Sequence, residues 1–342
     1  MRLILYPLSI IYGIITTIRN FLFDYGIMES KRHKIPIICV GNLSLGGSGK
    51  TPHVNYIAKV LSQSHKVSIL SRGYRRRLSG FHYIELNSTA SDIGDEPLQL
   101  KLNNPNCIVA VNGNRNIAVT KILSDHPETS VILLDDGFQH RKIAAGLNII
   151  VTPFHKPFIK DNLAPLGTLR EPINQATRAD IIIVSKTPSN TNSKERKEMT
   201  KSLNLKSHQK GYFSSIKYQR YKCIKNNSKL ENEQEYSITL VSGIENSTPL
   251  VKHLQEQGRE VNLIKFADHH NYTSKDIENI LSLHRQNESI KKLILTTEKD
   301  ATKLRRFLTD FKQENVYYIP INTVINNKEI FEKQLFDYVK SN

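Results

Sequence analysis

The residues most clearly suited to chemistry lie in a glycine-rich segment, residues 40–53, with the sequence VGNLSLGGSGKTPH. The segment follows an apolar run and precedes a helical pattern, which is the setting of a loop whose backbone amides and following helix bind phosphate. Ser44 stands where the usual pattern G-x-x-x-x-G-K-[ST] has its first glycine. Gly46, Gly47 and Gly49 are retained and permit a ligand to approach the backbone closely. The segment therefore predicts a nucleotide site despite its irregular start.

The roles of the loop residues follow from those in phosphate loops generally. Lys50 is expected to neutralise the β- and γ-phosphates of ATP, and Thr51 is expected to place its hydroxyl on Mg²⁺. Glycine-rich turns also precede helices in proteins that bind no nucleotide, but the preceding strand, the G-K-T sequence and the acids further along disfavour that interpretation. The residues predicted to contact the nucleotide are Ser44, Leu45, Gly46, Gly47, Ser48, Gly49, Lys50 and Thr51.

Two adjacent aspartates supply a second candidate group within VILLDDGFQH, residues 131–140. Asp135 ends an apolar run, and its carboxylate is expected to hold Mg²⁺ directly or through water. Asp136 is expected to share the ion or to orient a substrate group. The alternative, that the two acids only cap the next helix, is less favoured beside a phosphate loop.

The elements that must position these residues are apolar runs separated by helical patterns. Uninterrupted Ile and Val runs are typical of strands buried on both faces, and helices between them imply parallel βαβ units. The fold class is therefore predicted as α/β: a P-loop NTPase-like, mostly parallel sheet with helices on both faces. The predicted strands lie at residues 35–41, 66–70, 107–111, 131–135, 147–151 and 180–184.

The composition changes near residue 206, where a basic segment with strand-like alternation predicts a connecting β-ribbon. A second, smaller α/β domain follows, with predicted strands in YSITLVSG, VNLIKF and KLILTT and helices near 248–257, 274–286 and from about Lys299. The predicted organisation is an N-terminal helix at 1–25, a P-loop domain at 26–205, the second domain with its ribbon at 206–325, and a C-terminal helix at 326–342.

Length and charge agree with this organisation. The chain has 342 residues, more than one hydrophobic core usually supports, so two domains are expected. Its formal charge is +16, which predicts an anionic partner: nucleic acid, an acidic membrane surface or a phosphorylated substrate. The three cysteines are far apart in sequence and indicate neither disulfides nor a zinc site, in agreement with a reducing cytosol.

The N-terminal segment LILYPLSIIYGIITTI lies between Arg2 and Arg19 and carries no charge. It is shorter than the run of about 20 apolar residues that spans a bilayer, and no small-residue cleavage site follows it. We therefore expect a helix that lies in the membrane interface, with tyrosines and arginines as anchors. A helix packed on the protein core is the alternative.

Several motifs in fixed order resemble one family: GNLSLGGSGKTP, SRGY, GDEP, DDGFQH, LREP, FADHH and TTEKDATKL. Together they are similar to the tetraacyldisaccharide 4′-kinases, the lipid A 4′-kinases of Gram-negative bacteria, over residues 1 to about 305. The resemblance implies an enzyme that transfers the γ-phosphate of ATP to the 4′-hydroxyl of tetraacyldisaccharide 1-phosphate in lipid A biosynthesis. It also implies Mg²⁺, the lipid A disaccharide precursor and an anionic membrane surface as partners, no nucleic acid, and a location on the cytoplasmic face of the inner membrane.

The resemblance also implies roles for single residues. Asp95 in GDEP resembles the carboxylate that takes the hydroxyl proton, and His269 in FADHH resembles the histidine that partners it, so that Lys50, Asp95, Asp136 and His269 form the catalytic set. Without the resemblance, Asp95 would be interpreted as a helix cap or first-turn acid. His269 and His270 would be interpreted as solvated loop residues.

Two arginines are candidates for binding a substrate phosphate. Arg170 lies in LREP and Arg72 in SRGY, although an arginine in such a loop often forms only a surface ion pair. Glu298, Lys299 and Asp300 in TTEKD are expected to cap a helix or shape the site. Because Lys299 and Asp300 are adjacent, the motif is not the guanine-specifying N-K-x-D, and ATP is preferred over GTP.

Two other functions remain as alternatives. A nucleotide-dependent switch or chaperone would also carry the phosphate loop and the aspartates. A basic nucleic-acid-binding ATPase would interleave aromatic and basic residues, as YFSSIKYQRYK does.

Overall fold

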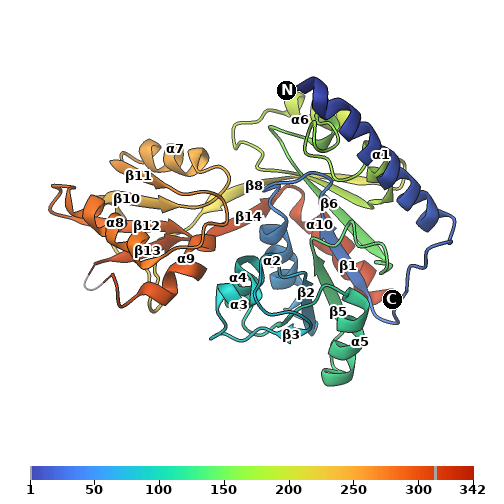
Figure 1. Cartoon of the computed structure of the whole chain (residues 1–342), viewed down its shortest axis with the longest axis horizontal. Coiled ribbons are helices and arrows are strands. Elements are labelled where there is room, and N and C mark those ends of the chain that lie inside the picture. The colour runs from blue at the N-terminus through green and yellow to red at the C-terminus, as the bar shows by residue number, and fades with distance from the viewer. Residues whose placement is uncertain (1, 312–313) are drawn as a thin grey trace.

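The computed structural model of the chain describes residues 2–311 and 314–342, which form two sheets of nine and five strands (Figure 1). The sheets stand side by side, each with its own helices, and two strands of the larger sheet reach toward the smaller unit (Figure 1).

The larger sheet has the order β14-β8-β7-β6-β1-β5-β2-β4-β3. Its inner strands are parallel, and the two outermost, β3 and β14, are antiparallel to their neighbours. The prediction of a mostly parallel sheet is therefore confirmed. The strands are β1 (Ile37–Gly41), β2 (Val67–Ser71), β3 (His82–Tyr83), β4 (Ile108–Val111), β5 (Val131–Asp135), β6 (Leu147–Pro153), β7 (Ile181–Ser185), β8 (Lys210–Tyr218) and β14 (Ile321–Ile325).

Helices cover both faces of this sheet because successive strand residues point to opposite sides. Ile38 and Val40 of β1 face a core shared with α2, α4 and α10, whereas Ile37 and Cys39 face the core beneath α5 and α6. Uninterrupted apolar strands are thus buried on both sides, as expected. The helices are α2 (Lys50–Leu61), α3 (Ala90–Ile93), α4 (Asp95–Asn103), α5 (Arg115–Asp125), α6 (Ser193–Leu203) and α10 (Lys328–Lys340).

The smaller sheet has the order β11-β10-β12-β13-β9 and is parallel except for β9. Helix α7 covers one face, and α8 and α9 cover the other. The predicted second α/β unit is therefore present. Its elements are β9 (Lys222–Cys223), β10 (Ser237–Ser242), α7 (Thr248–Glu256), β11 (Val261–Lys265), α8 (Ser274–Arg285), β12 (Lys292–Thr297), α9 (Glu298–Leu304) and β13 (Val316–Ile319).

Strands β8 and β14 form the antiparallel ribbon that joins the two units. β8 also pairs in parallel with β7, so residues 210–218 extend the larger sheet beyond the expected border at residue 205. The ribbon's second strand comes from residues 321–325, after the smaller sheet is complete. Helix α10 then returns to the larger unit, where Phe331 and Leu335 are fully buried.

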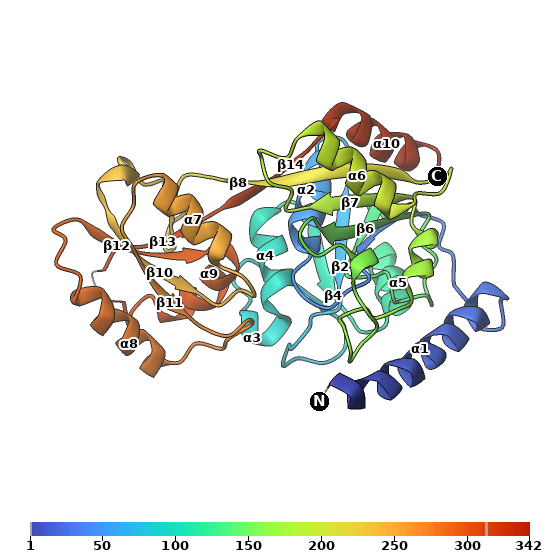
Figure 2. The same ribbon diagram turned by 90° about the horizontal axis from the view of Figure 1, so that it is seen from above.

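Helix α1 (Arg2–Asp24) lies along the edge of the larger unit and away from its sheet (Figure 2). Ser9 Oγ donates a hydrogen bond to the Leu163 carbonyl (2.8 Å), and Tyr12 Oη donates one to the Arg170 carbonyl (2.9 Å). Among the described residues, it is the one helix long and apolar enough to cross a membrane by length and composition alone.

Candidate active site

The glycine-rich loop joins the end of β1 to the start of α2, so the helix N-terminus points at the space in front of the loop (Figure 1). Gly46 and Gly49 have φ of 99° and 91°, a left-handed backbone that side chains with a Cβ rarely adopt. Leu45 N donates to the Thr168 carbonyl at 2.7 Å, which fixes the start of the loop. The irregular Ser44 therefore begins a loop with the positive-φ glycines that phosphate binding requires.

Side chains from neighbouring elements donate hydrogen bonds to this loop or contact its carbonyl groups. Ser185 Oγ, at the end of β7, donates to the Ser48 carbonyl at 2.6 Å, and the Lys186 ammonium donates to the Gly47 carbonyl. His53, on α2, contacts the Gly49 carbonyl through Nδ1 (2.7 Å) and Ser214 Oγ of β8 through Nε2 (2.8 Å). Burial lowers the pKa of His53 to about 4, so the imidazole is neutral inside the fold.

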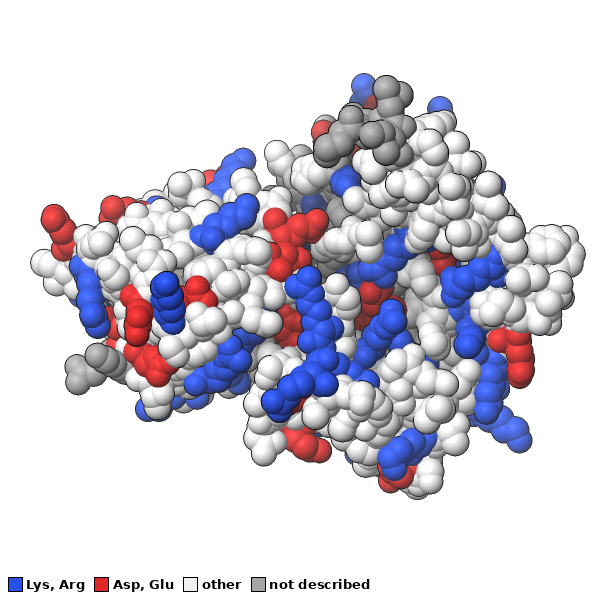
Figure 3. Space-filling view, in the orientation of Figure 1, with Lys and Arg blue, Asp and Glu red and all other residues white. Residues whose placement is uncertain are grey.

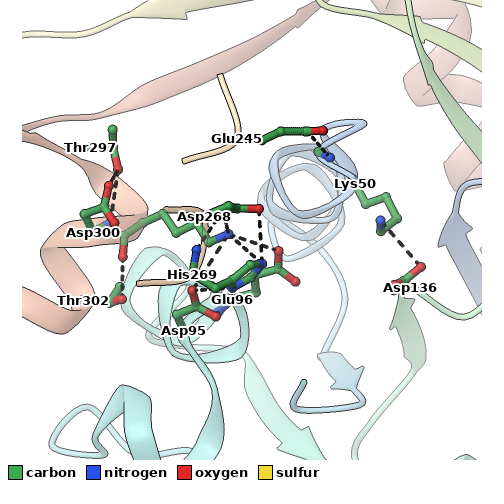
Figure 4. A network of polar contacts seen from close by, with 12 residues as sticks. Lys50, Asp95, Glu96, Asp136, Glu245, Asp268, His269, Thr297, Asp300 and Thr302 are labelled. Carbon is green, nitrogen blue, oxygen red and sulfur yellow. Dashed lines mark hydrogen bonds and ion pairs between the residues drawn. The ribbon is translucent and has the colours of Figure 1, made fainter. Parts of the chain in front are cut away.

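A carboxylate from the smaller unit lies on the loop. Glu245, in the turn after β10, accepts a hydrogen bond from Gly47 N at 2.6 Å (Figure 4). This amide belongs to the group that binds phosphate oxygens in such loops. Sequence reasoning missed Glu245, because nothing in its local sequence indicates a partner 198 residues away.

Asp135 is the last residue of β5 and Asp136 follows it; because β5 lies beside β1, both are next to the glycine-rich loop. Asp135 is buried; its Oδ2 accepts from Ser71 Oγ at 3.1 Å, whereas its Oδ1 has no partner among the described residues. Burial raises the pKa of Asp135 to about 7, and the charges of Glu96 and Asp136 add to this effect. A buried, unpartnered carboxylate oxygen beside a phosphate site fits a cation.

Asp136 has a different environment. Its carboxylate lies 3.7 Å from Lys50 Nζ (Figure 4) and 3.1 Å from Arg170 Nη1. Burial opposes its ionisation, but Lys50 and Arg170 outweigh burial and hold the pKa of Asp136 below its ordinary value. The residue is ionised, and it aligns the lysine of the phosphate loop.

Asp95 begins α4 and meets His269 from the smaller unit: His269 Nδ1 is 3.0 Å from Asp95 Oδ2 (Figure 4). The residue that caps α4 is Gly94, so Asp95 is a first-turn acid that also pairs across the two units. Burial favours the neutral acid, but the hydrogen bond from His269 and the charges of Lys299 and Lys303 outweigh it and hold the pKa of Asp95 well below its usual range.

The two histidines of FADHH have separate roles. His269 has a left-handed backbone (φ 58°) that turns its ring toward Asp95. His270 Nε2 instead contacts Asp276 Oδ2 at 3.0 Å, and its ring stacks on Phe266, so it secures the start of α8. Their adjacency in sequence conceals this difference.

The candidate arginines differ from each other. Arg170 Nη1 contacts Asp136 and also lies 3.3 Å from Gln139 Oε1. Arg72 is exposed and makes no ion pair within the described ranges. Arg170 is thus held beside the aspartates, whereas Arg72 is available for contacts with a ligand.

The structure gathers the predicted residues into two neighbouring groups. One holds the loop, Lys50, Asp136 and Arg170; the other holds Asp95 and His269 (Figure 4). Sequence reasoning expected Lys299 only to cap a helix or shape the site and did not name Lys303, although their spacing of one helical turn indicated a shared face. Both lysines lie at the second group.

Comparisons with known proteins agree on one family. A family model described as tetraacyldisaccharide-1-P 4′-kinase matches residues 1–340. The curated tetraacyldisaccharide 4′-kinase of Bacteroides thetaiotaomicron is 39% identical over 354 residues, covering 99% of this chain and 93% of that protein. The one from Flavobacterium johnsoniae is 39% identical over 346 residues, covering 100% and 98%.

A solved structure has a similar fold over the whole chain. It is the "apo" form of LpxK from Aquifex aeolicus in complex with ATP, at 28% sequence identity and a TM-score of 0.78, and the match covers 99% of each chain. The similarity therefore includes both sheets and the ribbon between them.

Proposed function

Because this chain belongs to the tetraacyldisaccharide-1-P 4′-kinase family, we propose that the loop at 44–51, Asp135 and the Asp95–His269 pair together carry out its reaction. The chain is an ATP-dependent kinase of lipid A biosynthesis, which transfers the γ-phosphate of ATP to the 4′-hydroxyl of tetraacyldisaccharide 1-phosphate. The whole-chain match favours neither a nucleotide switch nor a nucleic-acid-binding ATPase.

The loop amides and the N-terminus of α2 bind the phosphates of ATP, and Lys50 neutralises their charge. The positive-φ glycines of the loop support this role, and so does Asp136, which holds Lys50 beside the loop. Phosphoryl transfer depends mainly on positioning and charge neutralisation, so these contacts account for most of what the protein must supply.

Thr51 and Asp135 are the residues that would hold Mg²⁺. The unpartnered Oδ1 of Asp135 supports this assignment. No group of three or more His, Cys, Asp or Glu side chains suited to a metal occurs in the described part of the chain, which agrees with an ion that takes one or two protein ligands plus phosphate oxygens. An ion held by these residues would supply positive charge that offsets the charge of the ATP phosphates.

Asp95 accepts the proton of the attacking 4′-hydroxyl, and His269 holds the carboxylate in place. The environment of Asp95 supports this role, because the carboxylate is ionised, mostly buried and hydrogen-bonded to a histidine from the other unit. A carboxylate with a low pKa is a weak base, but it orients the hydroxyl through a hydrogen bond, which a reaction governed by positioning requires.

The phosphate of the lipid substrate binds to the arginines near the site. Arg170 pairs with Asp136, and the exposed Arg72 directly follows β2, the strand beside β5. On the face that Figure 3 shows, Lys and Arg side chains gather where the two units meet. An anionic headgroup is attracted to such a surface.

Helix α1 docks the enzyme on an anionic membrane surface, at the cytoplasmic face of the inner membrane. Apart from Phe23 near its C-terminal end, the side of α1 that faces the protein is small or polar, with Ser9, Thr16 and Asn20 buried. The opposite side exposes large apolar side chains: Tyr6, Leu8, Ile10, Ile11, Ile14, Ile15, Ile18 and Phe21. This distribution is the reverse of a helix packed on a core and fits a helix in the membrane interface.

The observation that carries the catalytic assignment is the contact between Asp95 and His269, and a transfer assay tests it. Purified enzyme is incubated with γ-labelled ATP, Mg²⁺ and tetraacyldisaccharide 1-phosphate in detergent micelles. Asp95→Asn is expected to lower kcat by roughly 100-fold or more while ATP affinity stays unchanged, because only proton acceptance is lost.

Asp337→Asn, which removes an exposed carboxylate on α10, is the matched control and should behave as wild type. An equal loss of ATP affinity in Asp95→Asn would make Asp95 a nucleotide or metal ligand. Label that appeared in added single-stranded nucleic acid instead of the lipid would overturn the substrate assignment.

A further inference from the structure

Two lysines of α9 reach the Asp95–His269 pair. Lys299 and Lys303 are one helical turn apart and share a face of the helix. Lys299 Nζ lies 3.0 Å from His269 Nε2, and Lys303 Nζ lies 3.2 Å from Asp95 Oδ2. Their side chains are only 17% and 7% exposed, so solvent screens these contacts weakly.

The contact between Lys299 and His269 indicates which nitrogen of the imidazole carries the proton. An ammonium group has only donors, so Lys299 donates to Nε2 of His269, and that nitrogen carries a lone pair. The proton of the neutral ring is then on Nδ1, from which it is donated to Asp95 Oδ2. Lys299, His269 and Asp95 form a chain of donors that ends at the carboxylate.

Other charges surround the pair. Asp268 Oδ2 lies 3.8 Å from His269 Nε2, farther than Lys299 Nζ at 3.0 Å, so the lysine is the closer partner of that nitrogen. Lys299 Nζ is 3.2 Å from Asp268 and 3.9 Å from Glu96, and Lys303 Nζ is 4.0 Å from Asp300. Each lysine therefore has an additional carboxylate that fixes its position.

We propose that Lys299 and Lys303 are positioning residues of the phosphoryl transfer, which hold His269 in the Nδ1–H tautomer and keep Asp95 ionised. The proposal rests on the role of Asp95 given above. Both lysines and His269 come from the smaller unit, whereas Asp95 comes from the larger one. The proton acceptor is therefore complete only when α9 lies against α4.

Steady-state kinetics across about pH 5 to 9 test the proposal with Lys299→Met, Lys303→Met, the double variant and Lys299→Arg. Lys299→Met is expected to lower kcat about tenfold or more with an unchanged KM for ATP, because the acceptor is misaligned while the nucleotide site is intact. Lys299→Arg keeps a charged donor and should recover part of that loss.

The pH profile separates positioning from structural support. Without the two lysines, burial of Asp95 is opposed only by its hydrogen bonds from His269 and from the Glu96 backbone amide, so the pKa of Asp95 rises. Because the pKa of Asp95 in the wild type lies well below the assayed range, wild type should show no acid limb from this group, whereas kcat of the double variant should fall toward the acid end of the range. Lys252→Met, on the exposed face of α7, is the control and should match wild type.

Wild-type kcat and pH profiles in the lysine variants would overturn the proposal. So would a loss of activity with an unchanged pH profile and no recovery in Lys299→Arg, which would indicate structural support only. Thermal melting checks that each variant is folded. If Lys303→Met is unfolded, the comparison of Lys299→Met with Lys299→Arg alone tests the positioning role. Wild-type turnover by Asp95→Asn would defeat the role of Asp95 itself, whereas an inactive Asp95→Asn with unaffected lysine variants would defeat only the positioning inference.

Discussion

Asp95 and Asp135 are both buried carboxyl groups, yet their surroundings push their pKa values apart. Asp95 receives a hydrogen bond from His269 and the charge of two lysines, so its pKa lies well below the ordinary range. Asp135 has one hydroxyl partner and two acidic neighbours, and burial raises its pKa to about 7. Such divergence is typical of sites in which similar groups have different roles. Here it separates the proposed proton acceptor from the proposed cation ligand.

His53 gives a prediction about stability at the scale of one residue. Its pKa is about 4 in the folded chain and 6.5 when exposed, because burial disfavours the imidazolium. A histidine with a lowered folded pKa contributes stability above the unfolded pKa and loses it as the pH falls. The free energy of unfolding should therefore drop by about 2 kcal/mol from this residue between about pH 7 and pH 5.

Urea unfolding of wild type and His53→Gln at the two pH values measures this effect. The variant should show a smaller drop, since glutamine does not titrate, whereas His155→Gln at an exposed position should show the wild-type drop. Equal drops in all three proteins would contradict the prediction.

At the scale of single elements, α1 has an inverted distribution of side chains. A helix on a soluble core buries its large apolar residues, but in α1 the buried residues are small or polar except for Phe23. Arg141 strengthens this attachment, donating to the Asn20 carbonyl at 2.9 Å and pairing with Asp24 at 2.6 Å. Polar contacts therefore hold the helix on the protein, and its exposed apolar side is free to contact the membrane interior.

Vesicle binding tests this element. Ile14→Glu combined with Ile18→Glu changes two side chains that are each 54% exposed, so the fold should be retained. Because burying one isoleucine contributes about 1.5–3 kcal/mol, binding to vesicles of phosphatidylethanolamine and phosphatidylglycerol should weaken by at least about tenfold. Sedimentation with vesicles measures it.

The control combines Ile290→Glu and Ile330→Glu, which alter exposed isoleucines away from α1. Unchanged sedimentation of the α1 variant, or an equal loss in the control, would remove α1 as the docking element.

At the scale of the whole molecule, residues of both units contact each other at the candidate site. Asp95 with His269, Gln99 with Glu298 (2.9 Å) and Gly47 with Glu245 all join residues from both units. The Glu245 contact has a direct consequence, because its carboxylate uses an amide that a phosphate oxygen needs. If the loop binds ATP as proposed, nucleotide binding displaces Glu245 from Gly47 N.

Glu245→Gln should therefore bind ATP more tightly than wild type. The substitution removes a negative charge and weakens a charge-assisted hydrogen bond of about 1.5 kcal/mol, so Kd should fall by up to about tenfold. Calorimetric titration with ATP measures the change, and Glu256→Gln on exposed α7 is the control. An unchanged or higher Kd in Glu245→Gln would show that the contact does not compete with nucleotide.

The sequence by itself determined the α/β class, the second unit and the residues of the phosphate loop. These features depend on residues that are close in the sequence. Strand and helix patterns repeat over a few residues. The loop from Ser44 to Thr51 is one continuous segment, so its glycines set its backbone conformation without help from distant residues. Asp135 and Asp136 could be placed beside the loop because parallel strands end at one edge of a sheet.

Only the tertiary structure added Glu245 and Lys303 to the site, and it gave distances to the Asp95–His269 pair, which the sequence predicted only through the family resemblance. Asp95 and His269 are 174 residues apart, and Glu245 is 198 residues from Gly47, so their contacts depend on how two sheets pack through the ribbon of β8 and β14. From sequence, Lys299 was expected only to cap a helix or shape the site and Lys303 had no assigned role; their contacts with the pair appear only when α9 is placed against α4. Local sequence sets backbone conformation, whereas the distance between remote side chains is set by the packing of whole elements.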